Sequence, residues 1–242
     1  MRILAFDTST GWCSIALGDG VHWLQREEPL GQTHSERLLP MALGLLAQAG
    51  WHLAELDGIG FGSGPGSFTG VRIACGVAQG LAFGLDRPVV PVCTLQAIAH
   101  EAARDETAPD PAARDEAAEP CILACTDARM NEVYVAGYCR HEVGWQSIME
   151  PTVLPPAAVS LPAYATQWTG AGNGFAAYPE LAQRLGITRV LPEVRATGRS
   201  IGELALPRLR AGEGVGAEEA LPLYVRQRVA LTAAQRAAGE RL

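Results

Sequence analysis

The sequence contains no lysine, so all of its basic residues are arginines. The phosphate-binding P-loop needs a lysine at the end of its glycine-rich turn, and this motif is therefore excluded. Acidic residues outnumber basic ones by 26 to 19, which gives a formal net charge of −7. A chain of this charge lacks the broad basic face with which a protein grips nucleic acid by itself.

Long apolar runs and paired cysteines are also missing. No apolar stretch reaches the roughly 18 residues of a membrane span without a polar or helix-breaking residue. The N-terminal segment MRILAFDTST becomes acidic too early for a signal peptide, so we expect a cytoplasmic protein with no membrane contact. The six cysteines, at positions 13, 75, 93, 121, 125 and 139, form neither CxxC pairs nor zinc-finger spacings. In the cytoplasm, we expect them to be free, packed thiols.

The most distinctive stretch is residues 62–84, GSGPGSFTGVRIACGVAQGLAFG. Its glycine-rich turn enters a segment with helical spacing in which Arg72 is the only charged residue. Such a turn can hold an anion on unpaired backbone N–H groups, but a tight turn before a buried helix is the commoner explanation. Small residues recur every four positions in two rows: Gly70, Ala74, Ala78 and Ala82, and Gly76 and Gly80. Glycine inside a helix costs about 1 kcal/mol relative to alanine, so these rows indicate that another backbone passes close by.

Residues 33–50 predict a second helix with a broad apolar stripe. Thr33 and Glu36 form a capping box that starts the helix at about His34, and Gly50 is a plausible C-cap. Pro40 lies well inside the helix and is expected to kink or divide it. A helical metal pair would need a second ligand four residues after His34, where Leu38 stands, so we expect no metal site here.

Strand patterns alternate with these helices, which predicts an α/β fold. We expect strands at residues 2–6, 14–17, 21–25, 57–61 and 88–92, and a helix at 94–103 capped by Thr94. Asp7 ends the first strand, where a carboxylate either handles a metal–phosphate group or caps its own turn. Residues 104–120 are acidic and rich in proline and alanine, as in an exposed linker.

The opening pattern returns at the middle of the chain. Residues 122–127, ILACTD, repeat residues 3–8, ILAFDT, 119 positions later, and the next strand pattern returns with them. An internal duplication is the better explanation, with one half at 1–103 and the other at 121–242. The second half shows a glycine turn at 170–174, a helix at 176–185 for which Pro179 indicates a late start, a helix at 200–210 interrupted near Pro207, and a helix at 229–242. Four arginines between 226 and 242 could meet an acidic partner or RNA, although a solvated helix is more common.

Two α/β halves, each opening with a hairpin and an acidic turn, suggest the architecture of actin, sugar kinases and Hsp70 (ASKHA), in which ATP sits between the halves. Several segments resemble one family with this fold, TsaB: ILAFDTST, HSERLLP (34–40), residues 62–82, DARMNEVY (127–134) and LPLYVR (221–226). TsaB proteins are non-catalytic paralogues of TsaD in the bacterial system that forms threonylcarbamoyladenosine (t6A) at position 37 of tRNAs reading ANN codons.

The resemblance implies a scaffold or activator subunit with no catalytic and no metal-binding residues of its own. It would pair with a TsaD-like subunit, or with a second copy of itself when alone. A TsaE-like ATPase would join the complex, and tRNA would be met indirectly. The implied contact residues come from the two broad apolar helices: His34, Leu38, Leu39, Met41, Ala42, Leu45, Leu46, Gly70, Arg72, Ile73, Ala74, Gly76, Val77, Gly80 and Leu81.

Three other functional hypotheses remain possible from the sequence. An ATP-dependent enzyme such as a small-molecule kinase could use Asp7 and both glycine turns. A peptidase has little support, because no nucleophile–base pair or zinc motif is visible. A weak, vestigial nucleotide site could persist at Asp7, Gly64, Gly66, Gly172 and Gly174. ATP is otherwise expected on the TsaD-like and TsaE-like partners.

Overall fold

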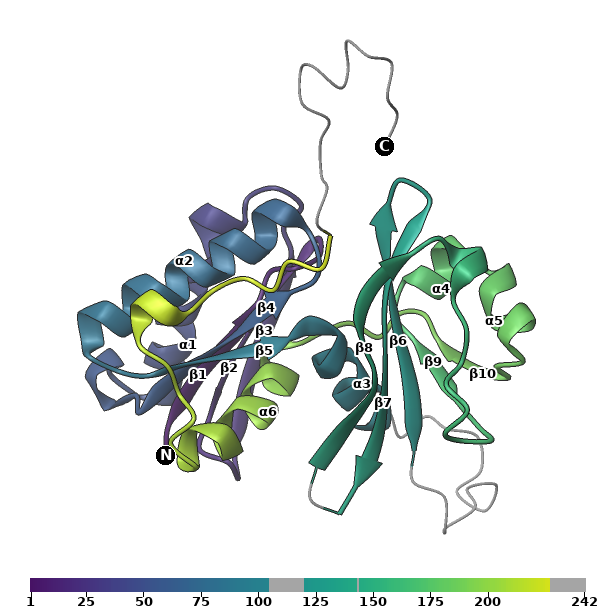
Figure 1. Cartoon of the computed structure of the whole chain (residues 1–242). Coiled ribbons are helices and arrows are strands. Elements are labelled where there is room, and N and C mark those ends of the chain that lie inside the picture. Colours follow the sequence, from purple (N-terminus) through teal and green to yellow (C-terminus); the bar gives the residue numbers. More distant parts are fainter. Residues whose placement is uncertain (105–119, 143, 227–242) are drawn as a thin grey trace.

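The computed structural model describes residues 1–104, 120–142 and 144–226 (Figure 1). The expected linker, apart from its end residues, and the expected helix at 229–242 lie outside these ranges. The division of the chain at 104–120 therefore stays a prediction.

The first half is built on a five-stranded mixed sheet. Three strands from the N-terminus pair antiparallel as consecutive hairpins, and two later strands add in parallel to the other side of the first. The strand order is β3-β2-β1-β4-β5. The strands are β1 (Ile3–Asp7), β2 (Trp12–Gly18), β3 (Trp23–Pro29), β4 (Gly58–Gly64) and β5 (Val89–Cys93).

The second half repeats this topology with a second five-stranded sheet. Its order, β10-β9-β6-β7-β8, is the first order read from the opposite edge, with the same antiparallel and parallel pairs. The predicted internal duplication and the two-halved α/β fold are confirmed. The strands are β6 (Cys121–Arg129), β7 (Glu132–His141), β8 (Gly144–Leu154), β9 (Thr169–Ala171) and β10 (Arg189–Leu191).

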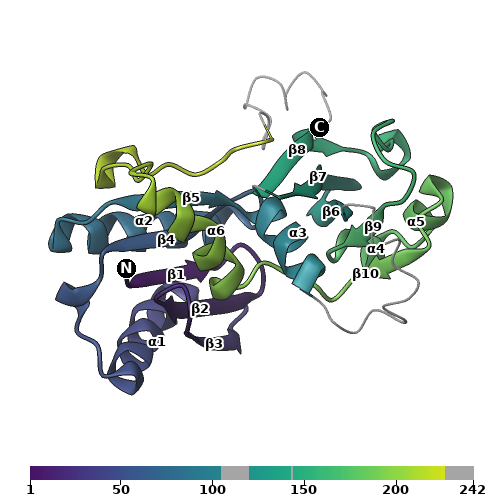
Figure 2. The same ribbon diagram turned by 90° about the horizontal axis from the view of Figure 1, so that it is seen from below.

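Helices cover both faces of each sheet, as Figures 1 and 2 show. Helices α1 (His34–Ala49) and α2 (Phe68–Leu85) lie on the outer face of the first sheet. Helices α3 (Thr94–Arg104) and α6 (Gly198–Arg210) lie between the two sheets. Helices α4 (Gly174–Ala177) and α5 (Glu180–Leu185) belong to the outer core of the second sheet. Short 3₁₀ turns occur at Leu53–Glu55, Pro156–Ala158 and Ala217–Glu219.

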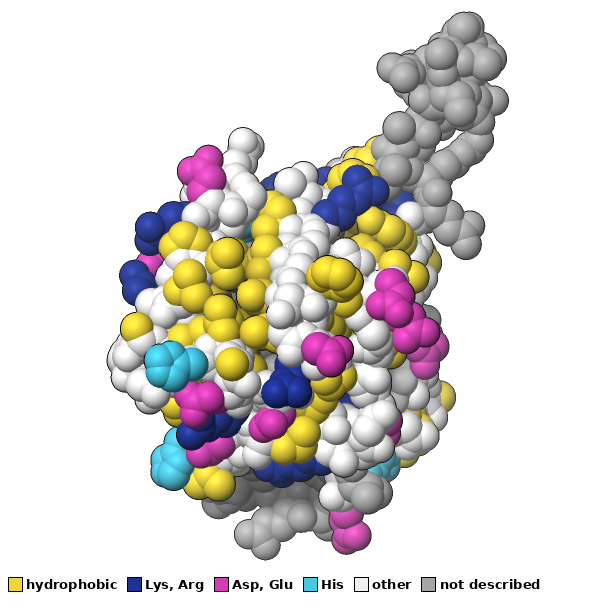
Figure 3. Space-filling model, turned by 90° about the vertical axis from the view of Figure 1, so that its left-hand side faces the viewer, with side chains coloured by type: hydrophobic (Ala, Val, Ile, Leu, Met, Phe, Trp, Pro, Cys, Tyr) yellow, Lys and Arg dark blue, Asp and Glu magenta, His cyan; other side chains and the backbone are white. Residues whose placement is uncertain are grey.

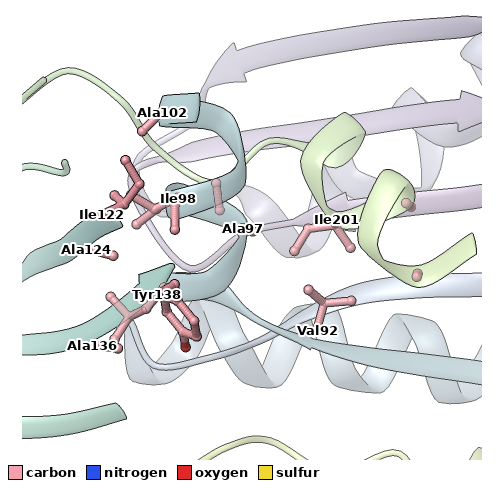
Figure 4. Close-up of a cluster of buried hydrophobic side chains, with 14 of the residues drawn as sticks. Val92, Ala97, Ile98, Ala102, Ile122, Ala124, Ala136, Tyr138 and Ile201 are labelled. Atoms are coloured by element: carbon pink, nitrogen blue, oxygen red, sulfur yellow. The ribbon is translucent and has the colours of Figure 1, made fainter. Parts of the chain in front are cut away.

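A shared core joins the halves, as Figure 4 shows. Ile98 of α3 and Ile201 of α6 are fully buried, and they pack in one cluster with Ile122 and Ala136 of the second sheet. Helix α6 comes late in the sequence but packs mainly on β1, β2 and β4, so the chain returns to the first half after crossing the second.

Three expected helix details are wrong. Pro40 does not divide α1, which continues through it; the proline lies on the exposed side of the helix, where water can satisfy the carbonyl that it leaves unbonded. Thr33 does not cap α1, because its hydroxyl donates to the Leu30 carbonyl instead. Helix α6 likewise continues through Pro207. The late start that Pro179 indicates for the helix at 176–185 is confirmed, because α5 begins at Glu180 and only the short α4 precedes it.

The expectation of six free thiols is wrong for one pair. Cys121 and Cys139 form a disulfide. They are directly opposite each other on the antiparallel strands β6 and β7, with Cα atoms 4.1 Å apart. Cross-strand neighbours this close can be bridged, and a spacing rule based on CxxC pairs does not detect them. The other four cysteines are free.

By length and composition alone, α2 would be long and apolar enough to cross a membrane. Its row of small residues, including Ala74 and Ala78, is buried in the core beneath the first sheet. A core helix of a globular α/β domain packs in this one-sided way.

Candidate functional site

The glycine loop between β4 and α2 packs on the turn that follows β1. The Ser67 amide donates to the Ser9 carbonyl at 2.7 Å, and a Cβ atom on Gly66 would lie 2.6 Å from that of Ser9. Gly70 lies against the Thr8 carbonyl, where no Cβ atom could fit. Ser67 also caps α2 by accepting from the Gly70 amide at 3.4 Å. These glycines are explained by close approach within the chain, and two of the amides expected to face an anion already have partners.

Asp7 closes its own turn at the end of β1. Its side chain is buried, and Oδ1 accepts hydrogen bonds from the amide and the hydroxyl of Ser9, at 2.9 and 2.7 Å. The Thr94 hydroxyl lies 3.5 Å from Oδ2. Burial raises the pKa of Asp7 to about 6, and the hydrogen bonds from Ser9 and Thr94 only partly oppose this rise. The carboxyl group therefore serves the turn itself.

The second glycine turn follows the same principle in the other half. Gly172 has a φ of +104°, and both Gly172 and Gly174 lie against Cys125 at distances that exclude a side chain. Between them, Asn173 accepts a hydrogen bond from the Asp127 amide at 3.1 Å. This turn therefore supports the acidic turn at the end of β6.

Both acidic turns line a cleft of about 510 Å³ between the halves. One wall carries Ser9, Thr10 and the start of α2, and the other carries Thr126, Asp127 and Asn173. Of the five residues predicted for a vestigial nucleotide site, Gly66 lines this cleft, whereas Asp7, Gly64, Gly172 and Gly174 lie behind its lining.

Residues 220–226, which we call the strap, run along α2 toward the second half (Figure 1), and residues 223–226 line the cleft. The Leu223 amide donates to the Ser63 carbonyl at 2.7 Å on the first half. Arg226 donates to the Ala128 carbonyl at 3.1 Å and pairs with Glu132 on the second half. The segments 127–134 and 221–226, both singled out in the sequence, therefore meet at one place.

The two predicted contact helices present an apolar outer face (Figure 3). Leu39, Leu43 and Phe83 are 40%, 44% and 85% exposed. A Cβ atom on Gly76 or Gly80 would meet no atom of the described residues within 4 Å, apart from its neighbours in the same helix backbone. We call this surface the α1–α2 face; of the predicted contact residues, it carries Leu39, Arg72, Ile73, Gly76, Val77, Gly80 and Leu81, which are exposed or half-buried.

The other predicted contact residues are buried. All of them except His34 and Gly70 belong to the core cluster between these helices and the first sheet, because the apolar stripe of each helix also covers its buried face. The buried residues are His34, Leu38, Met41, Ala42, Leu45, Leu46, Gly70 and Ala74.

Known proteins resemble this chain in both sequence and fold. The family model described as TsaD, tRNA N6-adenosine threonylcarbamoyltransferase, matches residues 28–221. The tRNA threonylcarbamoyladenosine biosynthesis protein TsaB of Escherichia coli is 36% identical over 95% of this chain and 96% of its own length. The protein of the same name from Haemophilus influenzae is 35% identical over 95% of each chain. The chain belongs to the TsaB family.

Solved structures agree with this assignment. YeaZ from Pseudomonas aeruginosa is 39% identical and superposes with a TM-score of 0.81 over 92% of this chain and 99% of its own. A second structure, described as an uncharacterized protein with similarity to peptidase YEAZ from Pseudomonas aeruginosa, gives a TM-score of 0.82 at the same identity. The predicted ASKHA-like fold is thereby confirmed.

This TsaB-family chain has no cluster of three or more His, Cys, Asp or Glu residues placed to hold a metal, as far as the described ranges show. His34 is buried at the start of α1, and Leu38, one turn later, is fully buried in the core. Within the described ranges, His34 Nε2 has no hydrogen-bond partner.

Sequence reasoning missed the individual strap residues and their contacts. Tyr224 accepts a hydrogen bond from Arg72 Nε at 2.9 Å, and Phe68 stacks against the same arginine. Arg72 and Tyr224 are 152 positions apart in the sequence, so no local sequence pattern could predict their contact. The available signal was that LPLYVR stood out as a motif in an otherwise irregular part of the chain.

Proposed function

We propose that this protein is a non-catalytic scaffold and activator subunit in the formation of t6A at position 37 of tRNA. The names of its relatives and the matching TsaD family model support a role in this modification. Within that role, we propose that it pairs with a TsaD-like catalytic paralogue through the α1–α2 face.

The observation that carries the proposal is the open surface of α2. Gly76 and Gly80 lie on the exposed side of the helix, where a Cβ atom would approach no other element of the described residues. Each costs about 1 kcal/mol of helix stability relative to alanine, and nothing in the fold of the described residues requires them. Glycines at helix surfaces let a second helix approach closely, and the same two helices also expose the apolar Leu39, Leu43 and Phe83.

A non-catalytic role agrees with the chemistry of the polar residues. Asp7 is committed to Ser9 and Thr94, and Leu38 replaces the second ligand that a helical histidine pair would need. We therefore assign nucleotide and metal chemistry to the TsaD-like and TsaE-like partners. tRNA meets this subunit through the complex, in the cytoplasm.

When the catalytic paralogue is absent, the same face would pair with a second copy of this chain. Such a dimer would be isologous, because each protomer contributes the same helices. Pairing with self and with a paralogue of the same fold would then compete for one surface.

Size exclusion with light scattering tests this proposal, on the chain alone and after mixing with its TsaD-like counterpart. We expect a homodimer that exchanges into a heterodimer. Leu43→Arg should weaken both assemblies, because it places a charge on the face without touching the core. Val21→Arg is the matched control, since Val21 is 79% exposed in the turn between β2 and β3.

Gly76→Leu should also block close approach of helices, at a cost of about 1–3 kcal/mol of association free energy. Leu38→Arg is unsuitable, because Leu38 is fully buried and the variant would unfold. A monomer that ignores the TsaD-like protein, or pairing that tolerates both Leu43→Arg and Gly76→Leu, would contradict the proposal.

A further inference from the structure

The strap contacts three parts of the molecule that are far apart in the sequence: the lining of the cleft, the second half and the exposed side of α2. We propose that the strap closes the cleft between the halves, and that Arg72 couples this closure to docking on the α1–α2 face. The inference rests on the proposed function, because it assigns a regulation to the same docking face.

The strap is fixed to the first half along α2. The Ala220 carbonyl accepts hydrogen bonds from Gln79 Nε2 at 2.8 Å and from the Cys75 thiol at 3.1 Å. Three residues later, the Leu223 amide donates to the Ser63 carbonyl, next to the glycine loop. A Cβ atom on Gly64 would lie 3.1 Å from the Leu223 carbonyl oxygen, so the strap also covers this loop.

Among the described residues, the hydrogen bonds that join the strap to the second half all come from the Arg226 side chain. Arg226 donates to the Ala128 carbonyl, pairs with Glu132 and lies 5.7 Å from the centre of the Tyr134 ring. The Arg226 side chain is only 13% exposed, so it offers little area to an outside partner. The strap has no helix or strand structure, and Leu221 and Tyr224 are 64% and 53% exposed. Segments held by so few contacts open at low free-energy cost.

Arg72 provides the link to the docking face. Its guanidinium lies 3.6 Å from the centre of the Phe68 ring and donates through Nε to the Tyr224 hydroxyl. Arg72 is one helical turn from Gly76, on the exposed side of α2. A partner helix that covers α2 would order the Arg72 side chain, and a closed strap orders it in the same way. Because each event removes part of the entropy cost of the other, the two should favour each other reciprocally.

Hydrogen exchange at the Leu223 amide, in the isolated full chain, tests closure without a partner. Arg226→Gln should speed this exchange about tenfold, because it removes a charge-assisted contact. Tyr224→Phe, which removes only the hydroxyl, should speed it by a smaller factor. The matched controls are Arg184→Gln, whose arginine bonds the Pro156 and Val159 carbonyls, and Tyr164→Phe, whose tyrosine is 49% exposed. Unchanged Leu223 exchange in Arg226→Gln would overturn strap closure.

The second stage measures affinity for the TsaD-like partner. We expect Arg226→Gln and Tyr224→Phe to weaken binding roughly three- to tenfold, and binding of the partner to slow Leu223 exchange in the parent chain. Faster exchange with unchanged affinity would overturn the coupling while leaving the docking proposal intact. Absence of binding by the parent chain would instead contradict the proposed function itself, so the two failures are distinguishable.

Discussion

The two halves share one strand order but treat their acidic turns differently. In the first half, Asp7 is 1% exposed and is sealed beneath the glycine loop with Ser9. In the second half, the Asp127 side chain is 16% exposed and pairs with Arg129, which is 87% exposed. The offset of 119 residues aligns Asp7 with Thr126, so the acidic residue stands one position later in the second copy, where it forms a surface ion pair instead of a buried carboxyl group.

The difference extends to the hairpins that follow these turns. Strands β6 and β7 join through Met130 and Asn131, which both have a φ of +57°, after a bulge that places Arg129 at +61°. Left-handed conformations in consecutive non-glycine residues are uncommon and mark a tight two-residue hairpin turn. This hairpin carries the Ala128 carbonyl and Glu132 that receive Arg226. The first half carries the proposed docking helices, and the second half supplies the contacts for Arg226 of the strap.

The largest effect on stability should come from adding one methyl group to the buried side of α2. Gly70→Ala should lower the free energy of unfolding by about 3 kcal/mol or more, because its Cβ atom would overlap the Thr8 carbonyl. Gly80→Ala, on the same helix, meets open space and should raise stability by up to about 1 kcal/mol. Urea denaturation measures both, and equal effects would show that the two faces of α2 do not differ.

Sequence patterns predicted the elements that depend on local periodicity and on the repeat. They placed both sheets, α1, α2 and the left-handed Gly50 cap, whose φ is 68°. They could not separate core from surface on α1, because Leu38 and Leu39 are adjacent leucines and only the packed sheet decides which one is buried. They also missed the Arg72–Tyr224 contact and the Cys121–Cys139 pair, because these depend on tertiary contact.

The disulfide stabilises the second half alone and offers the next comparison. Reduction should lower the free energy of unfolding by about 3 kcal/mol, since the bond closes a loop across the β6–β7 hairpin with a separation of 18 residues. Denaturation with and without a reducing agent measures this effect. A Cys121→Ser/Cys139→Ser variant should be insensitive to the reductant. Equal sensitivity of parent and variant would contradict the assignment of the effect to this pair.

A smaller effect on stability should come from titration of the buried Asp7 carboxyl group in the first half. The pKa of Asp7 is about 6 in the folded chain and 3.8 for an unperturbed aspartate. Protonated Asp7 therefore favours the folded state: this stability is fully present below pH 3.8 and is lost as pH rises through 6. The loss should be on the order of 2 kcal/mol, relative to an Asp7→Asn variant that lacks this titration. Denaturation at pH 4 and pH 7.5 measures the difference, and parallel pH profiles would contradict it.

The smallest expected effect is the response of the isolated chain to Mg–ATP. Gly66 and Gly70 pack on the turn after β1, and Gly172 and Gly174 pack on Cys125, so close packing within the chain explains these glycines without a bound phosphate. We expect no heat in calorimetry and no shift of the Gly66, Ser67 and Gly172 amide resonances on titration. Saturable shifts confined to these amides would show that the cleft still binds nucleotide. The two halves would then share a ligand as well as a fold. ATP binding would also become a candidate cause of strap closure.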